Sequence, residues 1–191
     1  MAYKIINAQK ALTDLVLNQY VNIAKADTYN PDKPIFKFST NLSGGVAESL
    51  AARIDAVLAE SAVELGAKAD NARPYERNND GTITFHFKVR EFKEGERPFK
   101  VWDMKMNPVT DVPNLTGGTV INANFAFYVS VFRGKAFIGL QPTHVQIKEA
   151  KVYTGGGAEP TFGAGEGYGD EGDDAPQFSG QSEAGMRPED F

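Results

Sequence analysis

The sequence of 191 residues predicts a mainly β fold, a small barrel with one α-helix, followed by an acidic tail. Three observations predict it. Several segments alternate apolar and polar residues with the period of two that is typical of strands. One segment repeats its apolar residues at helical spacing, and Gly-containing turns separate the strands that follow it. From Gly155 onward the chain is rich in Gly and has no periodicity, which indicates disorder because little apolar surface is available for burial.

The first predicted elements are a strand over 35–40, "IFKFST", and a helix over about 45–65. Ser43 fits the N-cap of this helix, and Gly66 fits its end. We expect its apolar stripe to pack against the barrel. The stripe consists of Val46, Leu50, Ile54, Val57 and Leu58.

Strands fill most of the chain after the helix. The turn signal "NDG" at 79–81 precedes a predicted strand over 82–92, and further strands are predicted over 99–105 and 119–132. The turn "RGK" then leads into a last pair of strand segments, which we expect to be broken at Pro142. The strand over 82–92 has one apolar face and one polar face. Ile83, Phe85, Phe87 and Val89 form the first, and His86, Lys88 and Arg90 form the second.

The charge of the chain is divided unevenly. Residues 154–191 contain nine acidic residues and one basic residue, Arg187, and therefore carry a net charge of −8. The remaining 1–153 contain sixteen acidic and nineteen basic residues and carry +3, so that the whole chain has −5. We therefore predict two parts, a mildly basic folded domain over 1–153 and a flexible acidic tail over 154–191.

Residues that usually carry catalysis or metal binding are scarce. The chain has no cysteine, and its two histidines, His86 and His144, lack partners at the spacing of a zinc site. No G-x-S-x-G motif is present. We expect neither an enzyme nor a metal or cofactor. The sequence also has no apolar run of membrane-spanning length, and its first residues lack the apolar core of a signal peptide, so a cytosolic protein is expected.

Cationic and aromatic residues alternate along several predicted strands. Single-stranded nucleic acid is bound without sequence preference by cations that contact phosphates and by exposed rings that stack on bases. The candidate binding residues of this kind are Lys33, Phe36, Lys37, Lys88, Arg90, Trp102, Lys105, Tyr128, Phe132, Arg133 and Lys135. Core packing explains Phe85, Phe87, Phe125 and Phe127, and it fits Phe36, Trp102 and Phe132 as well as stacking does. The lysines also fit ordinary solvated edge positions.

The order of several segments resembles one family. The segments are "NNDGTITFHFK", "VTDVPNLTGG", "FAFYVS", "LQPTHVQIKEA" and "TGGGAEPTFG", followed by the acidic run and the ending "EDF". Together they resemble the single-stranded-DNA-binding protein of short-tailed coliphages, the autographivirus replication type, from about residue 35 to the last residue. The resemblance implies an oligonucleotide-binding (OB) fold interrupted by one helix. It also implies roles in DNA replication, recombination and repair.

The resemblance implies specific binding residues. Lys88 in "FHFK" and Tyr128 in "FYVS" match binding positions of the family, and Lys33 and Lys37 match basic positions beside a family strand. Two positions depart from the family pattern. The family has an aromatic residue where this chain has Arg90, and it has a lysine where this chain has His86. Part of the binding is therefore expected to move to Arg90 and Trp102, or affinity to be weaker.

The acidic tail ends in Phe191, and the resemblance implies two roles for it. It is expected to bind the phage DNA polymerase and helicase-primase, and to compete with DNA for the basic groove. The resemblance also implies a homodimer in the cytoplasm of an infected bacterium. Because the acidic residues are tethered to the domain, their effective concentration near the groove is high, which fits competition with DNA. The expected tail residues are Asp170, Glu171, Asp173, Asp174, Glu189, Asp190 and Phe191. A virion or scaffold protein without DNA binding, and a β-barrel enzyme, are the alternatives.

Overall fold

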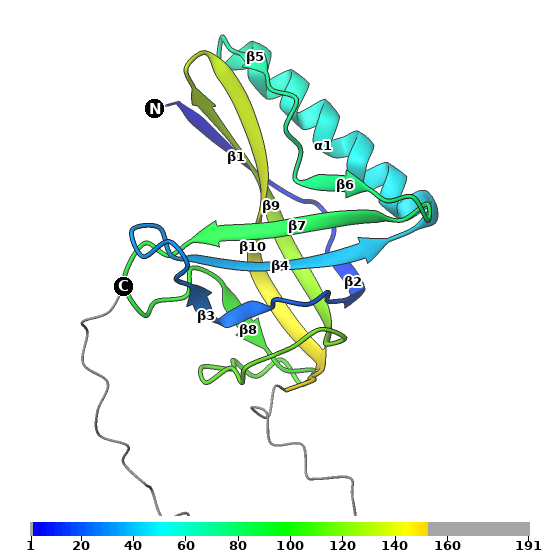
Figure 1. Ribbon diagram of the computed structural model, residues 1–191, viewed down its shortest axis with the longest axis vertical. Coiled ribbons are helices and arrows are strands. Elements are labelled where there is room, and N and C mark those ends of the chain that lie inside the picture. The colour runs from blue at the N-terminus through cyan, green and yellow to red at the C-terminus, as the bar shows by residue number, and fades with distance from the viewer. Residues whose placement is uncertain (1, 153–191) are drawn as a thin grey trace, which may run out of the picture. The chain divides into compact units, whose positions relative to one another are not determined.

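The computed structural model describes residues 2–152, which form ten strands and one helix (Figure 1). The predicted tail lies outside the described residues. In chain order the elements are β1 Tyr3–Asn7, β2 Leu12–Val16, β3 Asn22–Asp27, β4 Ile35–Leu42, α1 Gly44–Glu64, β5 Lys68–Ala69, β6 Tyr75–Arg77, β7 Ile83–Arg90, β8 Lys100–Trp102, β9 Val120–Phe132 and β10 Lys135–Glu149.

All ten strands belong to one mixed sheet, whose main order is β1-β9-β10-β7-β4-β3. β10 pairs in parallel with β7 and antiparallel with β9. The segment after β2 joins the two sides of this sheet. The Leu17 N–H donates to the Thr119 carbonyl at 2.8 Å, and the Asn18 N–H donates to the Ser39 carbonyl at 2.9 Å. The sheet therefore curls into a partly open barrel, and the predicted OB-type fold with one inserted helix is confirmed.

Phenylalanines fill the centre of the barrel. The Phe38 and Phe87 rings stack with centroids 4.9 Å apart, and Phe87 meets Phe125 edge to face at 5.6 Å. Phe125 meets Phe127 in the same way at 5.4 Å, and each such pair contributes about 0.5–1.5 kcal/mol beyond its buried area. The predicted core role of Phe85, Phe87, Phe125 and Phe127 is confirmed, since all four are buried.

Helix α1 occupies the predicted range, and Gly66, just beyond its last residue, terminates it as predicted. Gly66 has a φ of +63°, and its N–H donates to the Val63 carbonyl while the Ala67 N–H donates to the Ala62 carbonyl. This pair of bonds is a Schellman motif, which needs a left-handed residue at this position. Ser43 stands at the N-cap, although its side chain makes no capping hydrogen bond.

The buried face of α1 differs from the predicted stripe at one residue. Val46 is 61% exposed, whereas Leu50, Ile54, Val57 and Leu58 are buried. The prediction was wrong for Val46 because alanines complete the packed face next to the sheet. The small residues on this face are Ala47, Ala51, Ser61 and Ala62.

Two predicted strands have different ends from those expected. The strand predicted over 99–105 stops at Trp102, because the Asp103 carboxylate accepts the N–H groups of Lys105 and Asn107 at 2.8 Å and forms a turn. The predicted break at Pro142 was also wrong. β10 continues through it with a shift of register between Pro142 and His144.

Strands β9 and β10 form a long hairpin that crosses β4 and β7 (Figure 1). Arg133 and Gly134 connect them with φ values of +50° and +74°. Positive φ at both turn residues matches the twist of a two-residue hairpin.

No helix among residues 2–152 has the length and apolar character needed to cross a bilayer.

Candidate nucleic-acid interface

The outward faces of β4 and β7 place two cations side by side. Lys37 and Lys88 are directly opposite each other in the antiparallel pairing, and the adjacent outward pair is Ile35 and Arg90. Like charges opposite each other across a sheet are destabilising. A face that gathers positive charge in this way is therefore suited to an anionic ligand more than to the stability of the fold.

The cations differ in their partners. Lys37 forms an ion pair with Asp27, and the Arg90 guanidinium donates to the Asp32 carbonyl at 3.0 Å. The hydrogen bond from Lys37, followed by that from the Tyr29 N–H, lowers the pKa of Asp27 below its ordinary value. Lys88 has neither an ion pair nor a hydrogen bond to another side chain within residues 2–152. Its ammonium is the least compensated charge of this group.

A hollow of about 370 Å³ joins these cations to Tyr128. Lys88 and Arg90 border it from β7, Tyr128 and Ser130 from β9, and Gly139 from β10. Gly139 is the direct partner of Tyr128 in the β9–β10 ladder. Because Gly139 has no side chain, nothing from that position covers the tyrosine ring on the side of the hollow.

A second ring extends this aromatic surface. Tyr3 on β1 stacks on Tyr128 with centroids 5.9 Å apart and an interplanar angle of 25°. Tyr3 is 61% exposed. Tyr3 was not predicted from the sequence, although the alternation of Tyr3 and Ile5 was a weak signal for a strand with an exposed face.

Two further hollows, of about 380 and 240 Å³, adjoin the first. Lys88 borders all three, and His86 borders the two new ones. The three together form a continuous surface across the barrel, here named the barrel groove. The side chains that border the groove include Tyr20, Lys37, His86, Lys88, Arg90, Tyr128 and Phe137.

His86 is half-buried in the barrel groove. Its Nε2 atom is buried and has no hydrogen-bond partner among the described residues, and it lies 3.7 Å from a Glu76 carboxylate oxygen. It stands beside Lys88 at the place where the resembling family has a lysine.

Several predicted residues lie elsewhere. Phe132, Arg133 and Lys135 are at the tip of the β9–β10 hairpin, where the Arg133 guanidinium lies 5.1 Å from the Phe132 ring centroid and Lys135 pairs with Asp70 at 3.1 Å. They border none of the three hollows. Lys33 is exposed in the loop between β3 and β4.

Three other predictions have distinct outcomes. Phe36 is only 3% exposed and meets Phe99 edge to face at 5.6 Å, so its prediction as a stacking residue was wrong. It alternates with the outward Lys37 and therefore points into the core.

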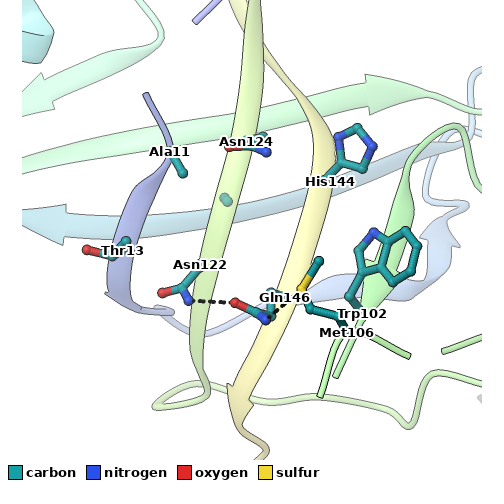
Figure 2. A pocket seen from close by; sticks show the side chains of 9 residues that line it. Ala11, Thr13, Trp102, Met106, Asn122, Asn124, His144 and Gln146 are labelled. Carbon is teal, nitrogen blue, oxygen red and sulfur yellow. Dashed lines mark hydrogen bonds between the residues drawn. The ribbon is translucent and has the colours of Figure 1, made fainter. Parts of the chain in front are cut away.

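Trp102 borders a separate cavity of about 470 Å³ (Figure 2), and Lys105 is exposed in the following turn. The predicted tail residues lie outside the described residues.

No protein-family model matches the sequence, and no curated protein does. Among solved structures, gp2.5, a single-stranded DNA binding protein encoded by bacteriophage T7, matches with a TM-score of 0.61 and 19% identity, over 82% of this chain and 99% of that one. The single-stranded DNA-binding protein of bacteriophage Enc34, as a C-terminal truncation, matches with a TM-score of 0.54 and 12% identity. That match covers 79% of this chain and 98% of the other.

This chain has the fold of these phage proteins. The agreement extends over nearly the whole length of both relatives, so the barrel and its inserted helix are shared as one unit. The fold expected from the sequence resemblance is thereby confirmed.

Proposed function

We propose that this chain is a phage-type single-stranded-DNA-binding protein without catalytic activity. The observation that carries the proposal is the barrel groove, in which the opposed Lys37 and Lys88 and the half-buried Tyr128 ring lie together on this fold. Lysines contact phosphates, and each base stacked on an aromatic ring contributes about 1–3 kcal/mol. Both relatives with this fold are described as single-stranded DNA binding proteins.

The groove favours a single strand for a physical reason. Its rings can stack only on bases that are neither paired with a second strand nor stacked on their neighbours. Duplex DNA does not offer such bases. The body carries a charge of only +3, whereas many duplex readers are strongly basic. A protein that binds only the unpaired strand removes its secondary structure, because binding stabilises the unpaired state over the paired one.

We propose that the protein acts in replication, recombination and repair of phage DNA in the cytoplasm of an infected bacterium. It is proposed to act as a homodimer that coats and protects the unpaired strand. The tail is proposed to recruit the phage DNA polymerase and helicase-primase through Glu189, Asp190 and Phe191. The cluster of Asp170, Glu171, Asp173 and Asp174 is proposed to compete with DNA for the barrel groove. The sequence resemblance and the charge division support these roles.

Fluorescence anisotropy with labelled oligo-dT and with a duplex of equal length, at several salt concentrations, tests the function. We expect oligo-dT to bind more tightly and its log affinity to fall with log salt concentration, with a slope of about −0.7 for each neutralised phosphate. Equal affinity for duplex DNA contradicts a single-strand protein. Absence of all binding favours the alternative, an interaction or scaffold protein with an acidic tail.

A further inference from the structure

A second cavity lies along the same β9–β10 ladder as the barrel groove, toward the end opposite to the hairpin turn. Its volume is about 470 Å³, within the range of small-molecule pockets. Thr13 of β2, Trp102 of β8, and side chains of β9 and β10 border it (Figure 2). It is named here the end pocket. The residues used below are Thr13, Trp102, Asn122, Asn124, His144 and Gln146.

A β-bulge turns two of these side chains toward the end pocket. Pro142 pairs with Phe125 and His144 pairs with Asn124, so Thr143 is an extra residue without a partner on β9. In an uninterrupted strand His144 would point inward, as the buried Pro142 does. The bulge reverses the alternation and places His144 and Gln146 on the outward face. Bulges of this kind commonly redirect a side chain at a functional site.

The pairings at this end build two rows across three strands. Lys100 pairs with His144, which pairs with Asn124. Trp102 pairs with Gln146, which pairs with Asn122. One row thus supplies a cation, an imidazole and an amide, and the next supplies an indole ring and two amides.

The second row is held in a fixed orientation. The Asn122 side-chain amide donates to Gln146 Oε1 at 2.8 Å, and Asn122 Oδ1 accepts the Asp14 N–H at 3.0 Å. The Gln146 amide donates in turn to the Asp103 carbonyl at 3.2 Å. This network fixes the floor of the end pocket beside Trp102, which reduces the cost of ordering the site when a ligand binds.

The first row keeps its hydrogen-bonding groups available. Asn124 is exposed and makes no side-chain hydrogen bond within residues 2–152, and His144 makes only a long contact of 3.4 Å with Thr143. Both side chains and the Trp102 ring face the same hollow (Figure 2). An amide offers a donor and an acceptor in one plane, the arrangement that matches the edge of a nucleobase.

The end pocket and the barrel groove are separate hollows that lie along the same β9–β10 ladder. Gln141 borders the groove and pairs with Ala126, and the next outward pair on the ladder is His144 and Asn124. Asn124 and Tyr128 are four positions apart on β9, which is about 13 Å along a strand. A single strand in the groove is therefore close enough to reach the pocket with a neighbouring base.

We propose that the end pocket binds one nucleobase of the strand that occupies the barrel groove. Trp102 stacks on the base, Asn124 and His144 form hydrogen bonds with its edge, and Lys100 contacts the adjoining phosphate. This inference rests on the proposed function. It adds a base preference at one position, since stacking alone tolerates every base whereas an amide with both a donor and an acceptor does not.

The chain has one tryptophan, Trp102, so its intrinsic fluorescence reports on the end pocket directly. We expect oligonucleotides to quench or shift this fluorescence in parallel with the anisotropy of bound DNA, and to differ among oligo-dT, oligo-dA and oligo-dC of equal length. Anisotropy that rises while Trp102 fluorescence stays constant refutes the end pocket and leaves the proposed function standing. Absence of both signals refutes the proposed function itself.

Two variants sharpen the test. We expect Trp102→Ala to weaken binding about 5- to 140-fold, the equivalent of one stacked base. Asn124→Ala is expected to weaken binding about 2- to 12-fold and to reduce the difference among the homopolymers. Asn114→Ala is the matched control, because Asn114 is exposed in a loop and borders neither the groove nor the pocket. Equal homopolymer preferences in Asn124→Ala and in the unmodified chain contradict the hydrogen-bonding role.

Discussion

Lys37 on β4 and Lys88 on β7 are direct cross-strand partners on the outward face of the barrel. Asp27 pairs with Lys37, whereas Lys88 has no ion pair within residues 2–152. Two opposed ammonium groups lower the stability of the sheet, so their juxtaposition points to a ligand rather than to folding. A polyanion reverses this cost, because a phosphate between the two lysines is attracted to both.

The first prediction concerns Lys88→Ala. We expect weaker binding of oligo-dT and a slope of log affinity against log salt concentration that is shallower by about 0.7. The free energy of unfolding is expected to stay the same or to rise by about 0.2–1 kcal/mol, because a like-charge contact is removed. Salt-dependent anisotropy and urea denaturation measure the two quantities.

Arg53→Ala is the control for this prediction, since Arg53 is an exposed cation on α1 that borders none of the described hollows. It removes the same charge from the chain. If both variants change the slope equally, the effect comes from overall charge, and the assignment of Lys88 to a phosphate contact is wrong.

The second prediction concerns Asp27→Asn. This change releases Lys37 from its ion pair, so we expect tighter binding of oligo-dT and a steeper salt slope. Glu48→Gln is the matched control, because Glu48 also pairs with a cation, Arg77, but borders no part of the barrel groove. Equal gains in both variants contradict a local role of Asp27.

Asp27→Asn also has an expected effect on stability. The hydrogen bond from Lys37 lowers the pKa of Asp27 in the folded state below the value of 3.8 that it has without such contacts. The contribution of the carboxylate is therefore present above about pH 4 and is lost as the pH falls through its folded pKa. We expect the variant to be less stable at neutral pH and the difference from the unmodified chain to shrink below pH 4. A difference that is constant with pH contradicts this interpretation.

The third prediction concerns the stacked rings of Tyr3 and Tyr128. Tyr128→Ala is expected to weaken binding by about 1–3 kcal/mol, the contribution of one stacked base. Tyr128→Phe keeps the ring and is expected to bind almost as tightly. Tyr3→Ala tests whether its exposed ring extends the stack, and the double variant measures the coupling between the two.

Phe92→Ala is the control for the tyrosines, since Phe92 is 79% exposed and borders none of the described hollows. It is expected to leave affinity unchanged. Unchanged affinity in Tyr128→Ala as well, with lower stability, would show that this ring only packs against its neighbours.

The sequence predicted those parts of the site that depend on alternation within a single strand. In β7 the period of two separated the buried Phe85 and Phe87 from the outward Lys88 and Arg90, and the structure agrees. The same reasoning placed Tyr128 opposite to the core face of β9. Within one strand the two faces follow from the local backbone geometry, so no knowledge of pairing is needed.

Features that depend on pairing between strands could not be predicted. The opposition of Lys37 and Lys88 follows from the register of β4 and β7, which the tertiary fold sets. Strand β1 was missed because Tyr3–Asn7 lies at the sheet edge and buries no residue fully, so its alternation is faint. The bulge at Thr143 reverses a pattern that is otherwise regular, and only the pairing with β9 reveals it.

The last prediction concerns the tail. Deletion of residues 169–191 removes Asp170, Glu171, Asp173, Asp174, Glu183, Glu189 and Asp190 together with Arg187, and so removes a net charge of −6. If these acids compete with DNA for the barrel groove, the truncated chain binds oligo-dT more tightly, and the gain shrinks at high salt because tethered charges are screened as DNA is. Anisotropy at low and high salt measures both effects.

The tail has two features that can be tested separately, its negative charge and the ring of its last residue, Phe191. Two variants of full length distinguish them. Replacement of Asp170, Glu171, Asp173 and Asp174 by their amides keeps the length of the tail while removing four charges, and it is expected to reproduce most of the gain in affinity. Phe191→Ala keeps every charge and is expected to leave DNA affinity unchanged while it weakens capture of the phage DNA polymerase. Weaker DNA binding after truncation would contradict competition, since it would mean that the tail contributes contacts to the strand.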